Sequence, residues 1–160
     1  MATTLVEDPT GVNDLSPRYE IGGLYEYVHA TYGHAYYKYY QFLDAVTYGA
    51  GDVLEHASAN GTGVSQDRAS GASSGRVPAG VALGVMTQNY FGFAQVSGRG
   101  TVILRTDGAV AAADYIVSHT ADDEADTMLD GEEEQVFAMS GTTDGADNLI
   151  AGVWHFKSLL

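Results

Sequence analysis

The side chains best suited to metal or acid–base chemistry in this 160-residue chain are its five histidines, at positions 29, 34, 56, 119 and 155. None forms a His-x-x-x-His pair or a Glu-flanked motif, the spacings that bring two metal ligands onto one face. His56 and His119 follow Asp52 and Asp114 in two similar segments, so equivalent strand ends explain them better than a shared ligand role. No Gly-x-Ser-x-Gly elbow is present for a nucleophilic serine. We expect no enzyme activity, no metal and no cofactor.

Carboxylates are the second chemically promising group, because eight of them fall within residues 122–134. Their positions do not follow the fixed ligand spacing of a calcium-binding EF-hand loop. A solvated acidic loop is the expected role, and weak, nonspecific cation binding is the alternative.

Two arginines are rare cations in this acidic chain. Arg99 and Arg105 could each anchor a carboxylate on a partner, although a solvated surface arginine is the simpler interpretation. Arg99 belongs to Ser97-Gly98-Arg99-Gly100, which lacks the lysine of a phosphate-binding loop. These residues predict a hairpin turn between strands at 91–96 and 101–104.

Tyrosines offer a different chemistry, that of an apolar ring with a polar tip that suits contact surfaces. Nine of the eleven tyrosines lie between Tyr19 and Tyr48. The pattern predicts strands at 24–29 and 36–43 with a turn at 31–34. Alternation places Tyr37 and Tyr39 on one face of the second strand and Tyr36 and Tyr40 on the other. We therefore expect both faces to be covered, one by the core and the other by a neighbour.

The overall charge limits the partners of the chain. Asp and Glu number 21 against seven Lys and Arg, for a net charge of -14. Nucleic-acid binding depends on Lys and Arg at the phosphates, so no nucleic-acid partner is expected. No apolar run is long enough to span a membrane. Scarce lysine and abundant Asp are typical of proteins from salt-loving organisms, in which folding stability rises with molar salt.

These side chains must be positioned by short strands. Gly51-Asp52-Val53-Leu54, followed by a strand that opens with Ala79-Gly80-Val81, is matched by Ala113-Asp114-Tyr115-Ile116 and Ala151-Gly152-Val153. No window keeps a helical period, and turn residues recur every 8–12 residues, a spacing typical of sandwiches and barrels. We predict an all-β fold, a small β-barrel or a sandwich. Residues 1–23 form an extended N-terminal arm that contains Pro9 and Pro17, and residues 24–160 form the single barrel domain.

A family resemblance rests on the same motifs. Gly23-Leu24-Tyr25-Glu26-Tyr27-Val28, Gly51-Asp52-Val53-Leu54, Ala79-Gly80-Val81-Ala82 and Phe93-Ala94-Gln95-Val96-Ser97-Gly98 resemble the capsid decoration, or cement, proteins of tailed viruses. The resemblance extends over about residues 20–156. It implies a small β-barrel, sometimes called a β-tulip, on the outer capsid surface. It also implies a trimer whose N-terminal arm reaches the major capsid protein. With the acidic composition, it suggests a virus of a halophilic host.

The expected function is therefore decoration and stabilisation of an icosahedral capsid. The alternatives are a tail or head-fibre structural protein of the virion, or a carbohydrate-binding β module that uses tyrosines as stacking platforms. The residues expected to contact the capsid are Arg18, Tyr19, Tyr36, Tyr37, Tyr39 and Tyr40.

Overall fold

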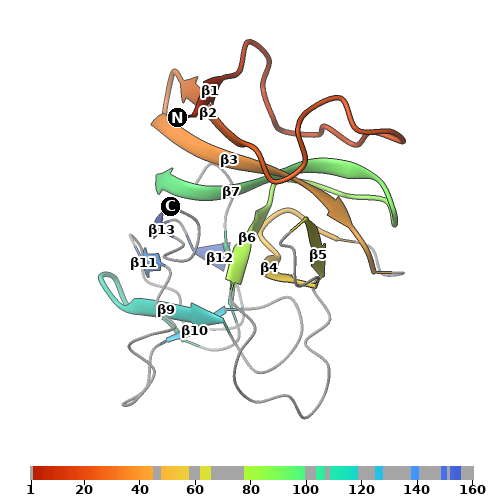
Figure 1. The fold of residues 1–160 in the computed structure, drawn as a ribbon. Coiled ribbons are helices and arrows are strands. Elements are labelled where there is room, and N and C mark those ends of the chain that lie inside the picture. Colours follow the sequence, from red (N-terminus) through yellow and green to blue (C-terminus); the bar gives the residue numbers. More distant parts are fainter. Residues whose placement is uncertain are drawn as a thin grey trace.

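In the computed structural model of the chain, every regular element of the described residues is a β-strand (Figure 1). The structure describes residues 2–44, 48–57, 62–65, 78–99, 104–106, 109–118, 125–127, 138–140, 149–150 and 152–155. The all-β prediction is confirmed. The strands are β1 (Thr3–Thr4), β2 (Leu24–His29), β3 (Gly33–Phe42), β4 (Val53–His56), β5 (Gly63–Ser65), β6 (Pro78–Ala82), β7 (Phe91–Arg99), β8 (Leu104–Arg105), β9 (Tyr115–Ser118), β10 (Ala125–Thr127), β11 (Ala138–Ser140), β12 (Leu149–Ile150) and β13 (Gly152–His155).

Five strands close into a barrel. The sheet order β3-β5-β4-β6-β7 is completed by a direct β3–β7 pairing, which returns the sheet to its first strand. All of these pairs are antiparallel except β3 with β5. Closure removes the exposed edges that an open sheet would present. Large side chains fill one cluster of the core, among them Tyr40, Phe42, Tyr48 and Leu54.

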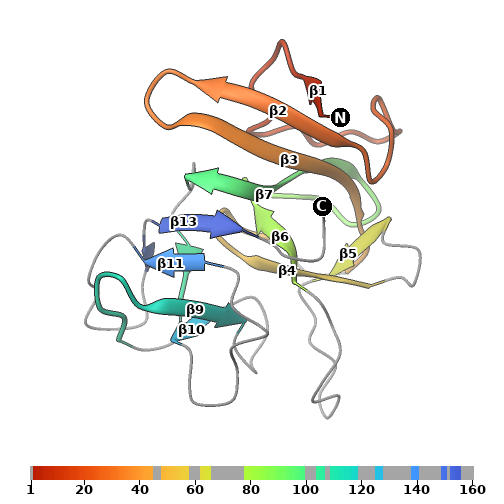
Figure 2. The same ribbon diagram turned by 60° about the vertical axis from the view of Figure 1, so that its left-hand side comes forward.

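A second half of the same sheet continues from the barrel. Beyond β7 come β13, β11, β9 and β10, and in Figure 2 β13 and β11 lie to the left of β6 and β4, with β9 and β10 below them. Val53 and Val81 of the barrel pack in one cluster with Ile116 of β9, and Leu104 and Val110 complete the contact. This apolar layer joins the two halves.

The repeated Asp turns of the sequence are equivalent in the structure. Asp52 accepts a hydrogen bond from Gly49 N at 2.5 Å, and Asp114 accepts one from Ala111 N at 2.8 Å. The residue before each aspartate has positive φ, 95° at Gly51 and 71° at Ala113. The strands that pair beside the two turns, however, do not both carry the Ala-Gly-Val residues.

Asp52 O accepts from Ala82 N, and Asp114 O accepts from Ser140 N, each at 2.9 Å. The structural counterpart of β6 is therefore β11, whereas the matching Ala-Gly-Val residues open β13, one strand further along the sheet. The short Ala-Gly-Val match marks the start of a strand and does not specify which strand pairs with it.

The predicted hairpin at 97–100 is wrong for the residues that the structure describes. Ser97–Arg99 continue β7 and pair with β13, and β8 pairs with β12. Gly98 has a φ of 98°, so its conformational freedom serves a bend within the strand. The acidic segment 122–134 lies outside the described residues, apart from β10.

Candidate functional site

An aromatic face on the outer side of the barrel is the densest grouping of the predicted contact residues. Strand alternation places Tyr37 and Tyr39 of β3 in one buried cluster with Tyr25 of β2 and with Phe91 and Phe93 of β7. Tyr25 and Phe93 meet edge to face, with ring centroids 5.4 Å apart. Such pairs add stability beyond the area that they bury.

The N-terminal segment, residues 2–23, covers this face. β1 pairs in parallel with β2, and Leu5 N donates to Glu26 O at 2.7 Å. Further along, Asp14 and Phe91 exchange both backbone hydrogen bonds at 2.8 Å. Leu5 and Val12 are buried in the aromatic cluster. The covering neighbour that was expected for this face is thus a segment of the same chain.

Tyr19 packs at the centre of the contact between the segment and the barrel. Its ring centroid lies 5.5 Å from that of Tyr25, 5.2 Å from that of Tyr39 and 5.0 Å from that of Phe93. Glu20 N donates to the hydroxyl of Tyr25 at 2.9 Å, and Gly22 N donates to Tyr39 O at 2.7 Å. The end of the segment is therefore fastened at several points.

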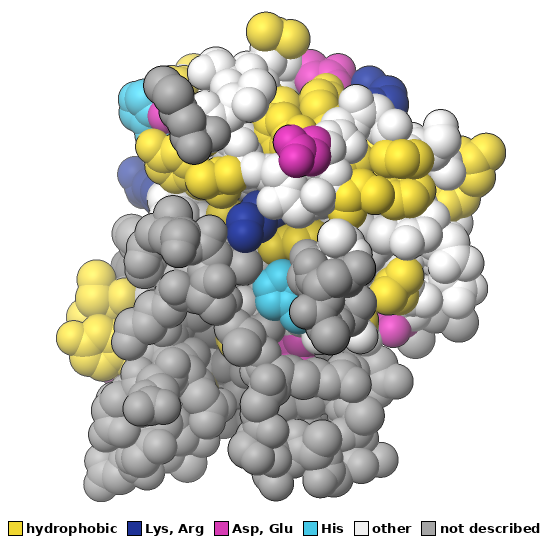
Figure 3. Space-filling model, in the orientation of Figure 1, with side chains coloured by type: hydrophobic (Ala, Val, Ile, Leu, Met, Phe, Trp, Pro, Cys, Tyr) yellow, Lys and Arg dark blue, Asp and Glu magenta, His cyan; other side chains and the backbone are white. Residues whose placement is uncertain are grey.

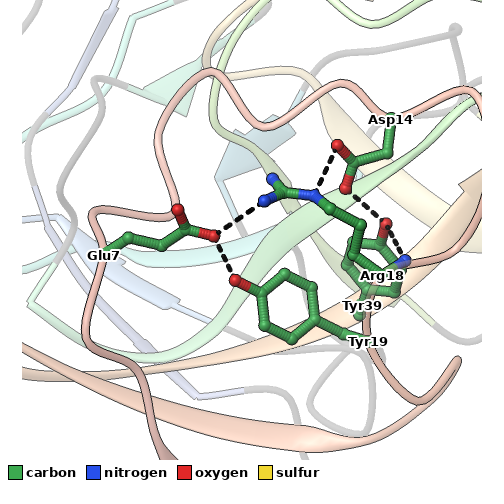
Figure 4. A network of polar contacts seen from close by, with 5 residues as sticks. All are labelled: Glu7, Asp14, Arg18, Tyr19 and Tyr39. Atoms are coloured by element: carbon green, nitrogen blue, oxygen red, sulfur yellow. Dashed lines mark hydrogen bonds and ion pairs between the residues drawn. The ribbon is translucent and has the colours of Figure 1, made fainter.

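A polar network closes over these rings (Figure 4). Arg18 Nε donates to Asp14 Oδ1 at 2.8 Å, and Arg18 Nη1 lies 3.3 Å from Glu7 Oε1. The Tyr39 hydroxyl donates to Asp14 Oδ2 at 2.7 Å, and the Tyr19 hydroxyl donates to Glu7. Two carboxylates, one guanidinium and two hydroxyls thus tie the segment to β3.

The pKa values of three members of the network, Arg18, Tyr19 and Tyr39, are raised. Burial, followed by the hydrogen bond to Asp14, raises the pKa of Tyr39. The hydrogen bond to Glu7, followed by burial, raises the pKa of Tyr19. The hydrogen bond to Asp14 likewise raises the pKa of Arg18. Each shift favours the protonated form, so the hydrogen bonds that these groups donate persist at neutral and moderately alkaline pH.

Burial corrects half of the predicted contact set. Tyr37, Tyr39 and Tyr40 are fully buried within the chain, so they have no surface to offer a capsid or a sugar. Their hydroxyls have internal partners, His29 Nε2, Asp14 Oδ2 and Ala79 O respectively. Single-strand alternation did not reveal this, because both faces of β3 are covered by other parts of the chain.

The other predicted contacts keep accessible surface. Tyr19 and Tyr36 are half-buried and Arg18 is exposed. The structure adds two apolar side chains that sequence reasoning missed, Val6 at 99% exposure and Leu15 at 75%. Both belong to the N-terminal segment, and Figure 3 shows hydrophobic side chains across the upper half of the molecule, over that segment and β2–β3. No local signal marks Val6, because its buried neighbour Leu5 is equally apolar.

The three histidines whose side chains the structure describes, at positions 29, 34 and 56, do not converge. His29 contacts Tyr37, and His34 contacts Glu26. The His56 ring lies edge-on to the Tyr40 ring, with centroids 5.7 Å apart. Burial and the nearby charge of Lys38 lower the pKa of His56. Among the described residues, no group of three or more His, Asp or Glu side chains is arranged to hold a metal ion. Within the same part of the chain, no helix suits a membrane span.

Comparison with known proteins identifies a similar fold. No protein-family model and no curated protein matches the chain. Among solved structures, the head fiber gp8.5 N base of bacteriophage phi29 superposes with a TM-score of 0.51 at 13% sequence identity. The match covers 74% of this chain and 92% of that one. At this identity the likeness establishes the shared fold, while function has to be argued from sites.

Proposed function

We propose that the chain is a structural protein of a virus particle that attaches to the outer surface of the head. The observation that carries the proposal is the fold that it shares with a phage head fiber base over 92% of that structure. The resemblance of residues 20–156 to capsid decoration proteins, which rests on different evidence, supports the same class of function.

The proposed partner is the major capsid protein, and the proposed contact surface is the exposed side of the N-terminal segment. Val6, Leu15 and Arg18 extend outward from a segment that hydrogen bonds and buried apolar side chains hold on the barrel. A contact surface that is ordered before binding loses less conformational entropy on docking than a disordered arm does. Repetition on a symmetric shell multiplies such contacts.

Two forms of this function are proposed. A decoration protein stabilises the shell by bridging its subunits, since binding to the assembled state adds to particle stability. A head-fibre base uses the same attachment to carry a fibre, and the name of the phi29 neighbour favours this second form. From the resemblance we propose that either form acts as a trimer, and from the acidic composition we propose a halophilic host.

Quantitative mass spectrometry of purified particles from the source of the chain tests the function. A copy number comparable to that of the major capsid protein supports a lattice-wide role, whereas a few copies place the chain at the tail or a vertex. The intact mass of the polypeptide separates the two forms. A mass near 16.9 kDa fits a decoration protein, and a longer polypeptide fits a fibre. Absence from the particles contradicts the proposal.

Rebinding to depleted particles tests the contact surface. Val6→Asp and Leu15→Asp place charge on exposed apolar positions of the segment and should weaken attachment by tenfold or more. Val28→Asp is the matched control, because Val28 is 53% exposed on β2, outside the segment. Equal loss in all three variants would exclude a specific role for the segment.

A further inference from the structure

One row of paired strand positions crosses the second half of the sheet. Arg99 of β7 pairs with Val153 of β13, Val153 with Met139 of β11, and Met139 with Tyr115 of β9. Directly paired residues of neighbouring strands lie on one face of a sheet. Met139 is 44% exposed, Tyr115 is 54% exposed, and Arg99 is also exposed. The row therefore presents a cation and two large apolar side chains to the surface.

The equivalent row of the barrel is buried. Tyr37, Gln95, Val81 and Val53 pair in the same manner across β3, β7, β6 and β4, and none is more than 3% exposed. Val53 and Val81 pack against Leu104, Val110 and Ile116. In the barrel, this face is part of an interior contact. In the second half, the row that corresponds to it through the repeated Asp turns is exposed at Tyr115, Met139 and Arg99.

The adjoining turn extends this exposed surface. In the barrel, β8 covers the first turn, because Arg105 N donates to Gly51 O at 3.1 Å and Arg105 Nη1 lies 3.6 Å from Asp52 Oδ1. In the second half, residues 111–113 of the equivalent turn are three consecutive exposed alanines. A contiguous exposed apolar run beside Tyr115 is unusual for a free surface and indicates a contact.

Charge identifies what can dock there. Arg18 and Arg105 have carboxylate partners, and Lys38 is half-buried. Arg99 has no carboxylate within ion-pair distance in the described part of the chain, and its guanidinium lies over the Tyr32 ring at 6.0 Å. The chain itself carries 21 carboxylates against seven cations. A second copy can therefore supply a carboxylate to pair with Arg99.

We propose that Arg99, Met139 and Tyr115, with the alanines at 111–113, form the surface on which a second copy of this chain docks. Tyr, Met and Arg are the residue types enriched at the centres of protein interfaces. This surface, through which copies of the chain associate, goes beyond the function proposed above. It is tested on the free protein, so its failure leaves the particle measurements standing.

Sedimentation equilibrium across a range of protein concentrations tests the apolar part of the surface. The parent chain should self-associate. The dissociation constant of the Tyr115→Ser/Met139→Ser variant should be at least tenfold higher than that of the parent. Val85→Ser is the matched control, because Val85 is 66% exposed outside the row, and it should associate like the parent. Thermal unfolding verifies that each variant folds. A strictly monomeric parent at moderate and high salt, or a double variant that associates like the parent, would overturn the proposal.

Charge reversal tests the role of Arg99 separately. Arg99→Glu should weaken association more than Arg99→Lys, which keeps the charge. Equal association of all three proteins would contradict a carboxylate partner. Because the chain has no cysteine, Tyr115→Cys carries a single thiol for a photo-crosslinker. This crosslinker should join two copies, whereas the same group at Val85→Cys should not. The reverse result would also overturn the proposal.

Discussion

At the scale of single residues, Gly92 shows how closely β7 is packed. A glycine inside a strand often marks a bulge or bend, but β7 pairs Gly92 with Tyr40 in regular register, and the shift in the ladder lies between Tyr36 and Tyr37. A Cβ at position 92 would lie 2.5 Å from Val12 O and 2.2 Å from Met86 Cε. Glycine is needed here because the N-terminal segment approaches the strand closely, which is a tertiary requirement.

Gly92→Ala should therefore destabilise the fold by about 1–3 kcal/mol, the usual cost of overpacking. The methionine can move, but the Val12 carbonyl belongs to backbone held beside β7. Gly84→Ala is the matched control, because no atom lies within 4 Å of its added Cβ, and its stability should be unchanged or slightly increased. Urea unfolding of the two variants measures the difference, and equal stabilities would contradict the close approach.

At the scale of elements, the N-terminal segment is fastened by alternating buried and exposed side chains. Leu5 is 7% exposed, whereas its neighbour Val6 is 99% exposed. The first contributes to the aromatic cluster and the second is available to a partner. One short segment thus combines a structural anchor with a candidate contact, and substitution separates the two roles.

Leu5→Ala should lower the free energy of unfolding by about 2 kcal/mol, because it removes buried apolar contacts. Val6→Ala should change it by less than about 0.5 kcal/mol, as is usual for surface positions. Denaturant unfolding with limited proteolysis of the segment measures both effects. Equal, small effects of the two substitutions would show that the segment is not docked in solution.

At the scale of the whole molecule, the net charge of -14 opposes compaction. Repulsion between carboxylates destabilises a folded chain most at low ionic strength, where the Debye length is long. In the described residues, the arginine partners of Glu7, Asp14 and Asp52 relieve this repulsion at only a few points. The composition therefore predicts a strong dependence of folding on salt.

The free energy of unfolding should rise as NaCl increases from about 0.1 M to about 2 M, because screening at 1 M shortens the Debye length to about 3 Å. Thermal unfolding across this range tests the halophilic assignment. Sucrose is the uncharged control, since it stabilises folded proteins without screening charge. A transition temperature that does not change with salt would count against this assignment.

The sequence by itself determined the strand-rich nature of the chain, the strand at 24–29 and most of the strand that became β3. It also identified the Asp turns at Asp52 and Asp114. These features are encoded locally, because a two-residue apolar period and a Gly-Asp or Ala-Asp turn act over a few neighbouring residues. The placement of Tyr37 and Tyr40 on opposite faces of β3 was predicted for the same reason.

Only the tertiary structure decided which strands are neighbours and which tyrosines remain accessible. The pairing of β3 with β7 joins positions as far apart as Ala35 and Gly98, and β11, which lacks the Ala-Gly-Val residues, occupies the position beside β9 that β6 occupies beside β4. Tyr37, Tyr39 and Tyr40 are buried because closure of the barrel and docking of the N-terminal segment cover both faces of one strand. Burial depends on the opposing surface, and the residues that form that surface lie far along the chain.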